Sequence, residues 1–365
     1  MHSFAKAIIT WQKFHGRHNL PWQNTCDPYA IWVSEIMLQQ TQVAAVIGYY
    51  AKFMLRFPTI EKLANATQEQ VLQYWSGLGY YSRARNMHNA AQKIVDDFEG
   101  VFPTQFDDIL SLPGIGRTTA AAISTFALNT PQPILDGNVK RVFTRHFNIV
   151  GYTGAPKVLA KLWQIAMREN PIGVGMNADA ISYTQGLMDL GATICTRSKP
   201  KCGLCPVNIS CIAFNNDLVK TLPTPKPRKV LPEKSVTMLV LINNNQVMLE
   251  KRASIGIWGG LWSFPELLND VNVASYDSNN QRTHHKKEHA QDLENIVLDK
   301  LTHTFTHYKL HIYPLLIYSN KNPQVNQSAT IWLSISEAVD AAIPTPVRKI
   351  LIALKTKILE ADLNC

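Results

Sequence analysis

The 365-residue sequence has no run of about 18 uninterrupted apolar residues, the length that a membrane-spanning helix needs. Its first six residues contain neither a long apolar stretch nor the small-residue cleavage site of a secretory signal. Because nothing indicates secretion, the six cysteines are not expected to form disulfides. These absences predict an intracellular, cytoplasmic protein without a membrane partner.

An excess of acidic residues is also absent from every part of the chain, whose net charge is +9. Residues 1–215 contain 19 Lys/Arg against 13 Asp/Glu, and residues 216–234 contain 5 against 2. Residues 235–365 contain 12 of each. The basic surplus of the first two segments favours a polyanionic partner such as nucleic acid.

Four of the cysteines, by contrast, are concentrated within 17 residues. They are Cys195, Cys202, Cys205 and Cys211, in the pattern C-x6-C-x2-C-x5-C. Four thiolates this close in sequence can bind one soft metal centre at little loop-closure cost. A zinc site usually pairs two C-x2-C units, whereas the longer outer loops here suit the wider [4Fe-4S] cluster. We therefore predict a [4Fe-4S] cluster and assign no role to Cys26 or Cys365.

Periodicity and composition divide the chain into three parts. Residues 1–215 are mostly helical, with helices predicted over residues 27–47, 60–75, 83–98, 117–128, 138–147, 157–169 and 178–190. Residues 216–234 contain four prolines among basic residues, which is typical of an extended linker. Strands are predicted at residues 235–242, 246–251 and within 303–318, and a polar loop at 270–292. The predicted fold is an all-α domain followed by a linker and an α+β domain.

Residues 112–120 predict a helix–hairpin–helix turn. Gly114 and Gly116 allow a tight turn and the close approach of a ligand. The unbonded N–H groups at the start of the next helix can then bind a DNA phosphate. An ordinary turn between helices is the alternative, and the basic, alanine-rich helix that follows favours the DNA interpretation.

Glu35 is a carboxylate on a largely apolar helix face. Its neighbours one helical turn away are Ile31, Trp32, Leu38 and Gln39. Burial there raises the pKa of a carboxyl group towards the neutral range that suits a general acid. A side chain that reaches solvent or pairs with an arginine is the alternative, and spacing alone does not decide between them.

Asp136 is placed to cap the helix that begins near Asn138. Backbone N–H groups would hold such a carboxylate in its ionised form, which could stabilise a sugar cation. Two carboxyl groups in unlike environments, one apolar and one hydrogen-bonded, suit the cleavage of a glycosidic bond.

The order of these features, a helix–hairpin–helix turn, then Asp136, then four cysteines, resembles that of the endonuclease III superfamily. Within it the chain is similar, over essentially its whole length, to the adenine DNA glycosylases of the MutY type. The segments that carry the resemblance are residues 20–23, 32–43, 77–81, 134–142 and 188–192. The resemblance implies a monomeric, DNA-associated repair enzyme that excises adenine opposite 8-oxoguanine or guanine in duplex DNA.

The resemblance also implies roles for individual residues. Glu35 would protonate the adenine, Asp136 would stabilise the sugar cation, and Asn138 would complete the catalytic set. The implied DNA contacts are Gln40, Thr41, Leu78, Tyr80, Gly114, Gly116, Thr118 and Lys140. Lyase members of the superfamily carry a lysine directly after the Gly-Arg of the hairpin, where this chain has Thr118. A threonine cannot form a Schiff base, so the sequence predicts a monofunctional hydrolase.

Residues 258–266 resemble the approach to the catalytic box of Nudix hydrolases, but the box itself is missing. Its Arg-Glu and Glu-Glu pairs would fall at Ala274-Ser275 and Ser278-Asn279, which leaves no carboxylates for magnesium. In the resembling family this domain checks for 8-oxoguanine through a loop matched here by Phe305, Thr306 and His307. Many members have serine where this chain has Thr306.

Three other functions fit the sequence less well. An endonuclease III-like glycosylase/lyase on oxidised pyrimidines is disfavoured by Thr118 and by the C-terminal domain. A DNA-binding protein without catalysis is disfavoured by the combination of Glu35 and Asp136. A nucleotide pyrophosphatase is disfavoured by the missing box.

Overall fold

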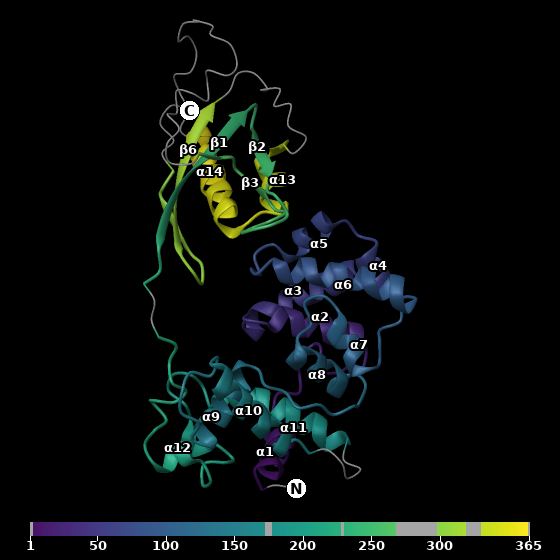
Figure 1. The fold of residues 1–365 in the computed structure, drawn as a ribbon. Helices are drawn as coiled ribbons and strands as arrows, with labels where there is room; N and C mark the ends of the chain where they lie inside the picture. The colour runs from purple at the N-terminus through teal and green to yellow at the C-terminus, as the bar shows by residue number, and fades with distance from the viewer. Residues whose placement is uncertain (1–2, 172–176, 228–229, 268–297, 319–329, 364–365) are drawn as a thin grey trace, which may run out of the picture. The chain divides into compact units, whose positions relative to one another are not determined.

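The structure is a computed structural model that describes residues 3–171, 177–227, 230–267, 298–318 and 330–363 (Figure 1). The chain folds into two compact units. The first comprises Met1–Ala66 and Asn86–Arg228, and the second comprises Thr67–Arg85 and Lys229–Cys365. The segment Thr67–Arg85 therefore groups with the C-terminal part, which the predicted domain boundaries did not anticipate. Within the described ranges, no helix is long and apolar enough to cross a membrane.

The first unit is helical, as predicted. Its elements are α1 (Ser3–His15), α2 (Pro28–Leu38), α3 (Val43–Arg56), α4 (Ile60–Ala64), α7 (Phe106–Ser111), α8 (Arg117–Phe126), α9 (Gly137–His146), α10 (Pro156–Glu169), α11 (Asn177–Asp189), the π-helical η1 (Leu190–Ile194), the 3-10 turn η2 (Cys202–Leu204) and α12 (Ile212–Asn215). Helix α6 (Ser82–Phe98) begins in the second unit and continues into the first.

The core of the first unit joins the N-terminus to the later helices. Helix α1 packs along α11, and Ile8 and Phe143 are fully buried in the shared apolar cluster. The buried pair Ile134 and Leu135 belongs to the same cluster and directly precedes Asp136. Because Ile134 and Leu135 are held in the core, the backbone position of the next residue, Asp136, is fixed as well. Helix α2 packs against α8 in the same unit (Figure 1).

The helix predicted over residues 27–47 is wrong in its length. It is two helices, α2 and α3, separated by residues 39–42. Asp27 caps α2 as expected, and its side chain accepts a hydrogen bond from Tyr29 N (3.0 Å). Gln40 adopts a left-handed conformation with φ of 59°, which interrupts the helix and leaves Gln40 exposed. Local propensity gave no warning of this break, because none of these residues is glycine or proline.

The second unit contains a mixed sheet with the strand order β3-β2-β1-β6-β5, in which β4 also pairs with β1 and β7 with β2. Its strands are β1 (Glu233–Asn243), β2 (Gln246–Lys251), β3 (Trp262–Ser263), β4 (Glu266–Leu267), β5 (Leu301–Thr304), β6 (Lys309–Tyr318) and β7 (Thr330–Ser334). Strands β1 and β6 are parallel, and the remaining pairs are antiparallel. Its helices are α5 (Gln68–Trp75), α13 (Ile335–Asp340) and α14 (Thr345–Leu363).

The predicted strands are confirmed, whereas β7 and α14 were not predicted. The polar loop predicted at residues 270–292 lies outside the described residues. The first part of the predicted linker is packed against other residues. Leu222 is buried, and its carbonyl accepts a hydrogen bond from Arg145 Nε (2.9 Å). Thr224 Oγ1 likewise accepts from Gly151 N (3.0 Å). Residues up to 224 therefore pack on the first unit.

Candidate active site

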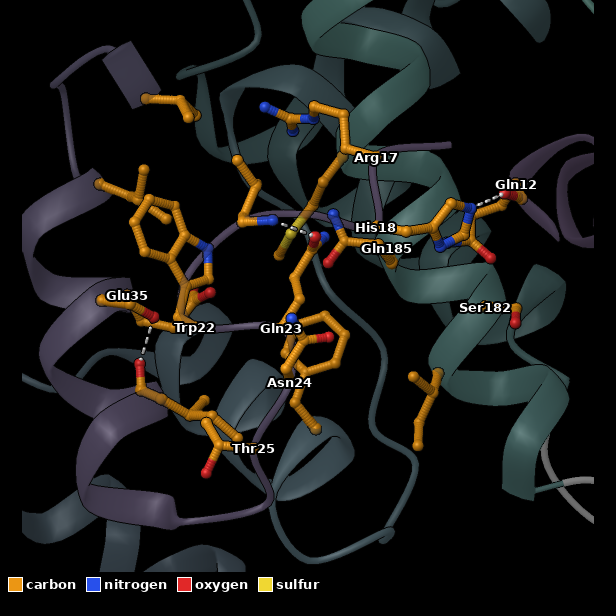
Figure 2. A pocket seen from close by; sticks show the side chains of 18 of the residues that line it. Gln12, Arg17, His18, Trp22, Gln23, Asn24, Thr25, Glu35, Ser182 and Gln185 are labelled. Atoms are coloured by element: carbon orange, nitrogen blue, oxygen red, sulfur yellow. Dashed lines mark hydrogen bonds between the residues drawn. The ribbon is translucent and has the colours of Figure 1, made fainter. Parts of the chain in front are cut away.

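A cavity of about 460 Å³ opens in the first unit. Helix α2, helix α11 and the segment between α1 and α2 line it, and its labelled side chains are seen in Figure 2. Its lining includes Arg17, Trp22, Cys26, Glu35 and Gln185. Its volume is sufficient for a small planar molecule, and it combines aromatic, amide and charged groups.

Glu35 lies in this cavity on α2, a helix whose other side chains are almost all buried. Its side chain is only partly accessible, and protein surrounds it elsewhere. Desolvation by burial, reinforced by the nearby charge of Asp136, raises the pKa of Glu35 to about 8. Glu35 therefore carries a proton at neutral pH, which favours the general-acid hypothesis over a solvated carboxylate.

Asp136 is the N-cap of α9, as predicted, and its Oδ1 accepts a hydrogen bond from Val139 N (2.7 Å). Asn138 Nδ2 donates to its Oδ2 (3.3 Å). The pKa of Asp136 is nevertheless raised, because desolvation by burial outweighs the hydrogen bonds and the charge of Arg141 that oppose it. The expectation that the backbone N–H groups of the cap keep Asp136 ionised is thus opposed by its burial. Those opposing contacts still distinguish Asp136 from Glu35, whose pKa is raised both by desolvation and by the charge of Asp136.

A chain of hydrogen bonds runs from Asp136 towards the cysteine loop. Asn138 Oδ1 accepts from Arg141 (2.9 Å), and Arg141 also donates to the carbonyl oxygens of Gly191 (2.6 Å) and Cys195 (2.7 Å). Gly191 is required here, because an added Cβ would lie 2.5 Å from Asn138 Cβ. The orientation of Asn138, and through it of Asp136, thus depends on the backbone next to Cys195.

A buried ion pair closes another part of the cavity. Asp189 is fully buried and binds Arg17 through both the backbone N–H (2.8 Å) and the guanidinium (2.6 Å). Gln185 Nε2 donates to the same carboxylate (2.9 Å). A carboxylate that is ionised only accepts hydrogen bonds, so the Gln185 atom that faces Asp189 is the amide nitrogen. The Gln185 Oε1 therefore faces away from Asp189 and can act as an acceptor.

The helix–hairpin–helix turn is present between α7 and α8. Gly114 has φ of 79°, and an added Cβ would lie 2.7 Å from Asn86 Cβ, so glycine is required there. Gly116 has an ordinary backbone and open space where a side chain would begin. No side chain caps α8, which leaves its first N–H groups open to an anion.

The remaining predicted DNA contacts of the first unit are distributed over several elements. Thr41 follows the exposed Gln40 in the break between α2 and α3. Thr118 lies half-buried in the first turn of α8. Lys140 is half-buried in the first turn of α9, four residues after Asp136.

The four predicted metal ligands line one small pocket, together with Arg145. Arg145 donates to Cys195 Sγ (3.4 Å). Among the described residues no group of three or more potential ligands could hold a single metal ion. Burial raises the pKa of Cys202 and Cys211, and raises that of Cys205 to about 12. Burial therefore disfavours the thiolate forms of Cys202, Cys205 and Cys211, which a bound metal centre would stabilise.

All but one of the predicted contacts of the second unit line another cavity of about 460 Å³. Tyr80 lines it from the loop after α5, and residues 303–307 line it from β5 and the turn that follows. Phe305 anchors this turn, with its ring 5.3 Å from that of Trp258, and leaves Thr306 and His307 exposed. Leu78 is only 8% exposed and belongs to the core, so it does not share the accessibility of Tyr80.

Sequence reasoning did not assign Arg17, Trp22 or Gln185 to the site. Trp22 lay in a segment quoted for the family resemblance, but nothing in its spacing indicated a cavity wall. Gln185 and Arg17 are 168 positions apart, and only the packing of α1 against α11 brings them to one carboxylate. No local sequence signal could have found that pairing.

We predict opposite sensitivities for the two glycines of the hairpin. Gly114→Ala forces a left-handed alanine against Asn86, and should lower the free energy of unfolding by about 1–3 kcal/mol. Gly116→Ala meets no such contact and should change it by less than about 1 kcal/mol. Denaturant titration followed by circular dichroism measures both. Equal stability of the two variants would contradict this account of the turn.

Comparison with known proteins gives consistent results. The family described as HhH-GPD superfamily base excision DNA repair protein matches residues 33–167, and the NUDIX domain matches residues 237–353. The adenine DNA glycosylase of Buchnera aphidicola subsp. Schizaphis graminum is 38% identical over 95% of this chain and 97% of its own length. The human adenine DNA glycosylase is 30% identical over 95% of this chain and 73% of its own length.

Among solved structures, a thermostable thymine-DNA glycosylase is similar to this chain, with a TM-score of 0.52 and 29% identity. The match covers 58% of this chain and 95% of that protein.

Proposed function

The chain belongs to the family of adenine DNA glycosylases of base excision repair, and from this premise we propose that it excises adenine paired with 8-oxoguanine, and with guanine, using Glu35 as the acid. The observation that carries the proposal is the protonated carboxyl in the base-sized cavity. A hydrolysis of this kind needs a proton for the departing base and a negative charge near the sugar.

Glu35 and Asp136 divide these tasks. Transfer of the Glu35 proton to a ring nitrogen of adenine makes the base a better leaving group as its bond to the sugar breaks. The cation that develops on the sugar is then stabilised by the Asp136 carboxylate, which Asn138 orients. Glu35, now ionised, can accept a proton from the water that attacks the sugar.

The cavity also offers contacts for an extruded adenine. Trp22 supplies an aromatic wall. Gln185 Oε1 is the acceptor left after its amide N–H binds Asp189, so it suits the exocyclic amino group of adenine. This arrangement supports the choice of an amino-bearing base over one that has a carbonyl at the same position.

Strand cleavage by a Schiff base is not part of the proposal. Thr118, at the start of α8, has no amine. The product is therefore an intact strand with an abasic sugar, and the basic surface and the open N-terminus of α8 serve to bind its phosphates.

Recognition of 8-oxoguanine is assigned to the cavity of the second unit. Oxidation converts the N7 acceptor of guanine into an N–H donor and adds an oxygen at C8. A hydroxyl can both accept and donate a hydrogen bond, so Thr306, exposed at the tip of the turn, suits the oxidised base. Tyr80, which lines the same cavity, suits a wedge in the base stack.

A [4Fe-4S] cluster bound by Cys195, Cys202, Cys205 and Cys211 completes the proposal. When bound, it supplies a rigid link between the four thiolates of the loop. This chain's residues extend that rigidity, because the Cys195 carbonyl accepts from Arg141 and Arg141 donates to Asn138. The loop is therefore expected to influence Asp136 through hydrogen bonds rather than through direct contact.

For the acid, we predict that single-turnover excision of adenine from an adenine:8-oxoguanine duplex declines as pH rises through about 8. The reason is that Glu35 must keep its proton and loses it above its pKa. Glu35→Gln should lose about 10²–10⁴ in rate at neutral pH, because an amide cannot donate the proton. Strand breaks should appear only after alkali treatment. Wild-type rates in Glu35→Gln would remove this residue from the mechanism.

For lesion recognition, Thr306→Ala should slow excision opposite 8-oxoguanine more than excision opposite guanine. Thr306→Ser retains the hydroxyl and serves as the matched control. Its excision rates opposite 8-oxoguanine and opposite guanine should both be close to those of the wild type. A single hydrogen bond of this kind is typically worth about 0.5–1.5 kcal/mol, or roughly threefold to tenfold in rate. An equal loss on both substrates in Thr306→Ala would count against lesion reading by this side chain.

For the cluster, protein purified without oxygen should contain about four iron atoms per chain. Cys202→Ser should lose iron and its visible absorbance, whereas Cys26→Ser, which changes an exposed thiol outside the loop, should retain both. Iron analysis and absorbance measure the outcome without reference to activity. Stoichiometric zinc in place of iron would refute the cluster.

A further inference from the structure

The loop that carries Tyr80 has an unusual backbone. Gly77, Gly79 and Tyr80 all have positive φ, at 102°, 77° and 49°. The first two are tolerated because glycine has no Cβ, whereas a tyrosine in the left-handed region is unfavourable. Such a conformation persists only where neighbouring contacts impose it, and it is often found at functional positions.

Arg83 supplies several of these contacts from the first turn of α6. Its guanidinium donates to the Gly79 carbonyl (3.1 Å), and its backbone N–H donates to the Tyr80 carbonyl (2.9 Å). The Trp75 indole N–H donates to the same Gly79 carbonyl (3.1 Å). The Gly79 carbonyl is thus held by two side-chain donors, and the Tyr80 carbonyl is held by one backbone donor.

Arg83 also fixes the Tyr80 ring. The guanidinium carbon lies 5.5 Å from the centre of the Tyr80 ring and 5.3 Å from that of Trp75, distances typical of cation–π contacts. Arg83 itself is only 8% exposed, whereas Tyr80 is 44% exposed. The tyrosine therefore rests against a buried, planar cation and remains open to solvent elsewhere.

The identity of the cation matters in this position. A guanidinium can stack on an aromatic ring and donate in its own plane at the same time, whereas a lysine ammonium is a compact charge that cannot do both as well. Burial lowers the pKa of Arg83 to about 10, so it stays charged at neutral pH despite the cost of desolvation. Burying an uncharged methionine of similar length in this position would cost less desolvation free energy than burying the arginine.

We propose that Arg83 is a positioning residue that holds Tyr80 in the orientation from which it enters the duplex. The proposal rests on the proposed function, in which Tyr80 is the wedge. Arg83 would act before bond cleavage, on the extrusion of the base, and would not touch the reacting atoms. Its loss should therefore slow the opening of the duplex and leave the ionisation of Glu35 unchanged.

The test is a double-mutant cycle that combines Arg83→Met with Tyr80→Ala. Single-turnover excision and the fluorescence of a 2-aminopurine placed beside the target adenine are recorded for each variant. Arg83→Met should reduce both the fluorescence rise and the excision rate, the latter about tenfold, with the descending limb of the pH profile unmoved. In the Tyr80→Ala background, Arg83→Met should cause little further loss. Arg83→Lys should recover part of the rate.

Arg56→Met is the matched control, because Arg56 is exposed and its guanidinium lies 5.2 Å from the Phe57 ring, yet it has no role in the proposal. It should leave both signals unchanged. The positioning role is overturned if Arg83→Met retains the wild-type excision rate. It is also overturned if Arg83→Met lowers that rate by the same factor in the wild-type and Tyr80→Ala backgrounds. Wild-type excision by Tyr80→Ala would overturn the wedge and the positioning role together, while the excision chemistry of Glu35 would stand.

Discussion

Removal of water from the Glu35 carboxyl is the constraint around which the first unit is arranged. Helix α2 buries most of its side chains, so its one carboxylate can meet solvent only through the cavity that it lines. Ionising that group would create a charge in a poorly solvated site beside a second carboxylate. The proton is therefore retained at neutral pH. A reactive acid thus follows from burial in the core.

The second carboxylate has a more polar environment. Asp136 is also desolvated, but a backbone N–H, an amide and a guanidinium lie around it. The apolar pair Ile134 and Leu135 anchors the preceding segment in the core, and the contacts of Arg141 join the following helix to the cysteine loop. In the second unit, likewise, the loop that carries Tyr80 and the turn that carries Thr306 line a single cavity.

Much of this could be predicted from the sequence, where the deciding interactions are local. The cap at Asp136, the glycine turn at Gly114 and the apolar face around Glu35 depend on neighbours within one helical turn. The break after α2 was missed because Gln40 adopts φ of 59° without glycine or proline to announce it. The raised pKa of Asp136 was missed because capping is local, whereas burial depends on the whole unit. Gln185, Arg17 and Arg83 were missed for the same reason, since each acquires its role through three-dimensional contacts.

The most direct test of the account is the titration of the Glu35 carboxyl itself. Protein labelled with carbon-13 at the glutamate carboxyl groups would be followed by NMR from pH 4 to 10, with Glu35→Gln used to assign the signal. The account predicts that one carboxyl resonance, absent from the variant, titrates with a midpoint of about 8. A Glu35 resonance that titrates near 4.5, the value of an ordinary glutamate, would contradict the account.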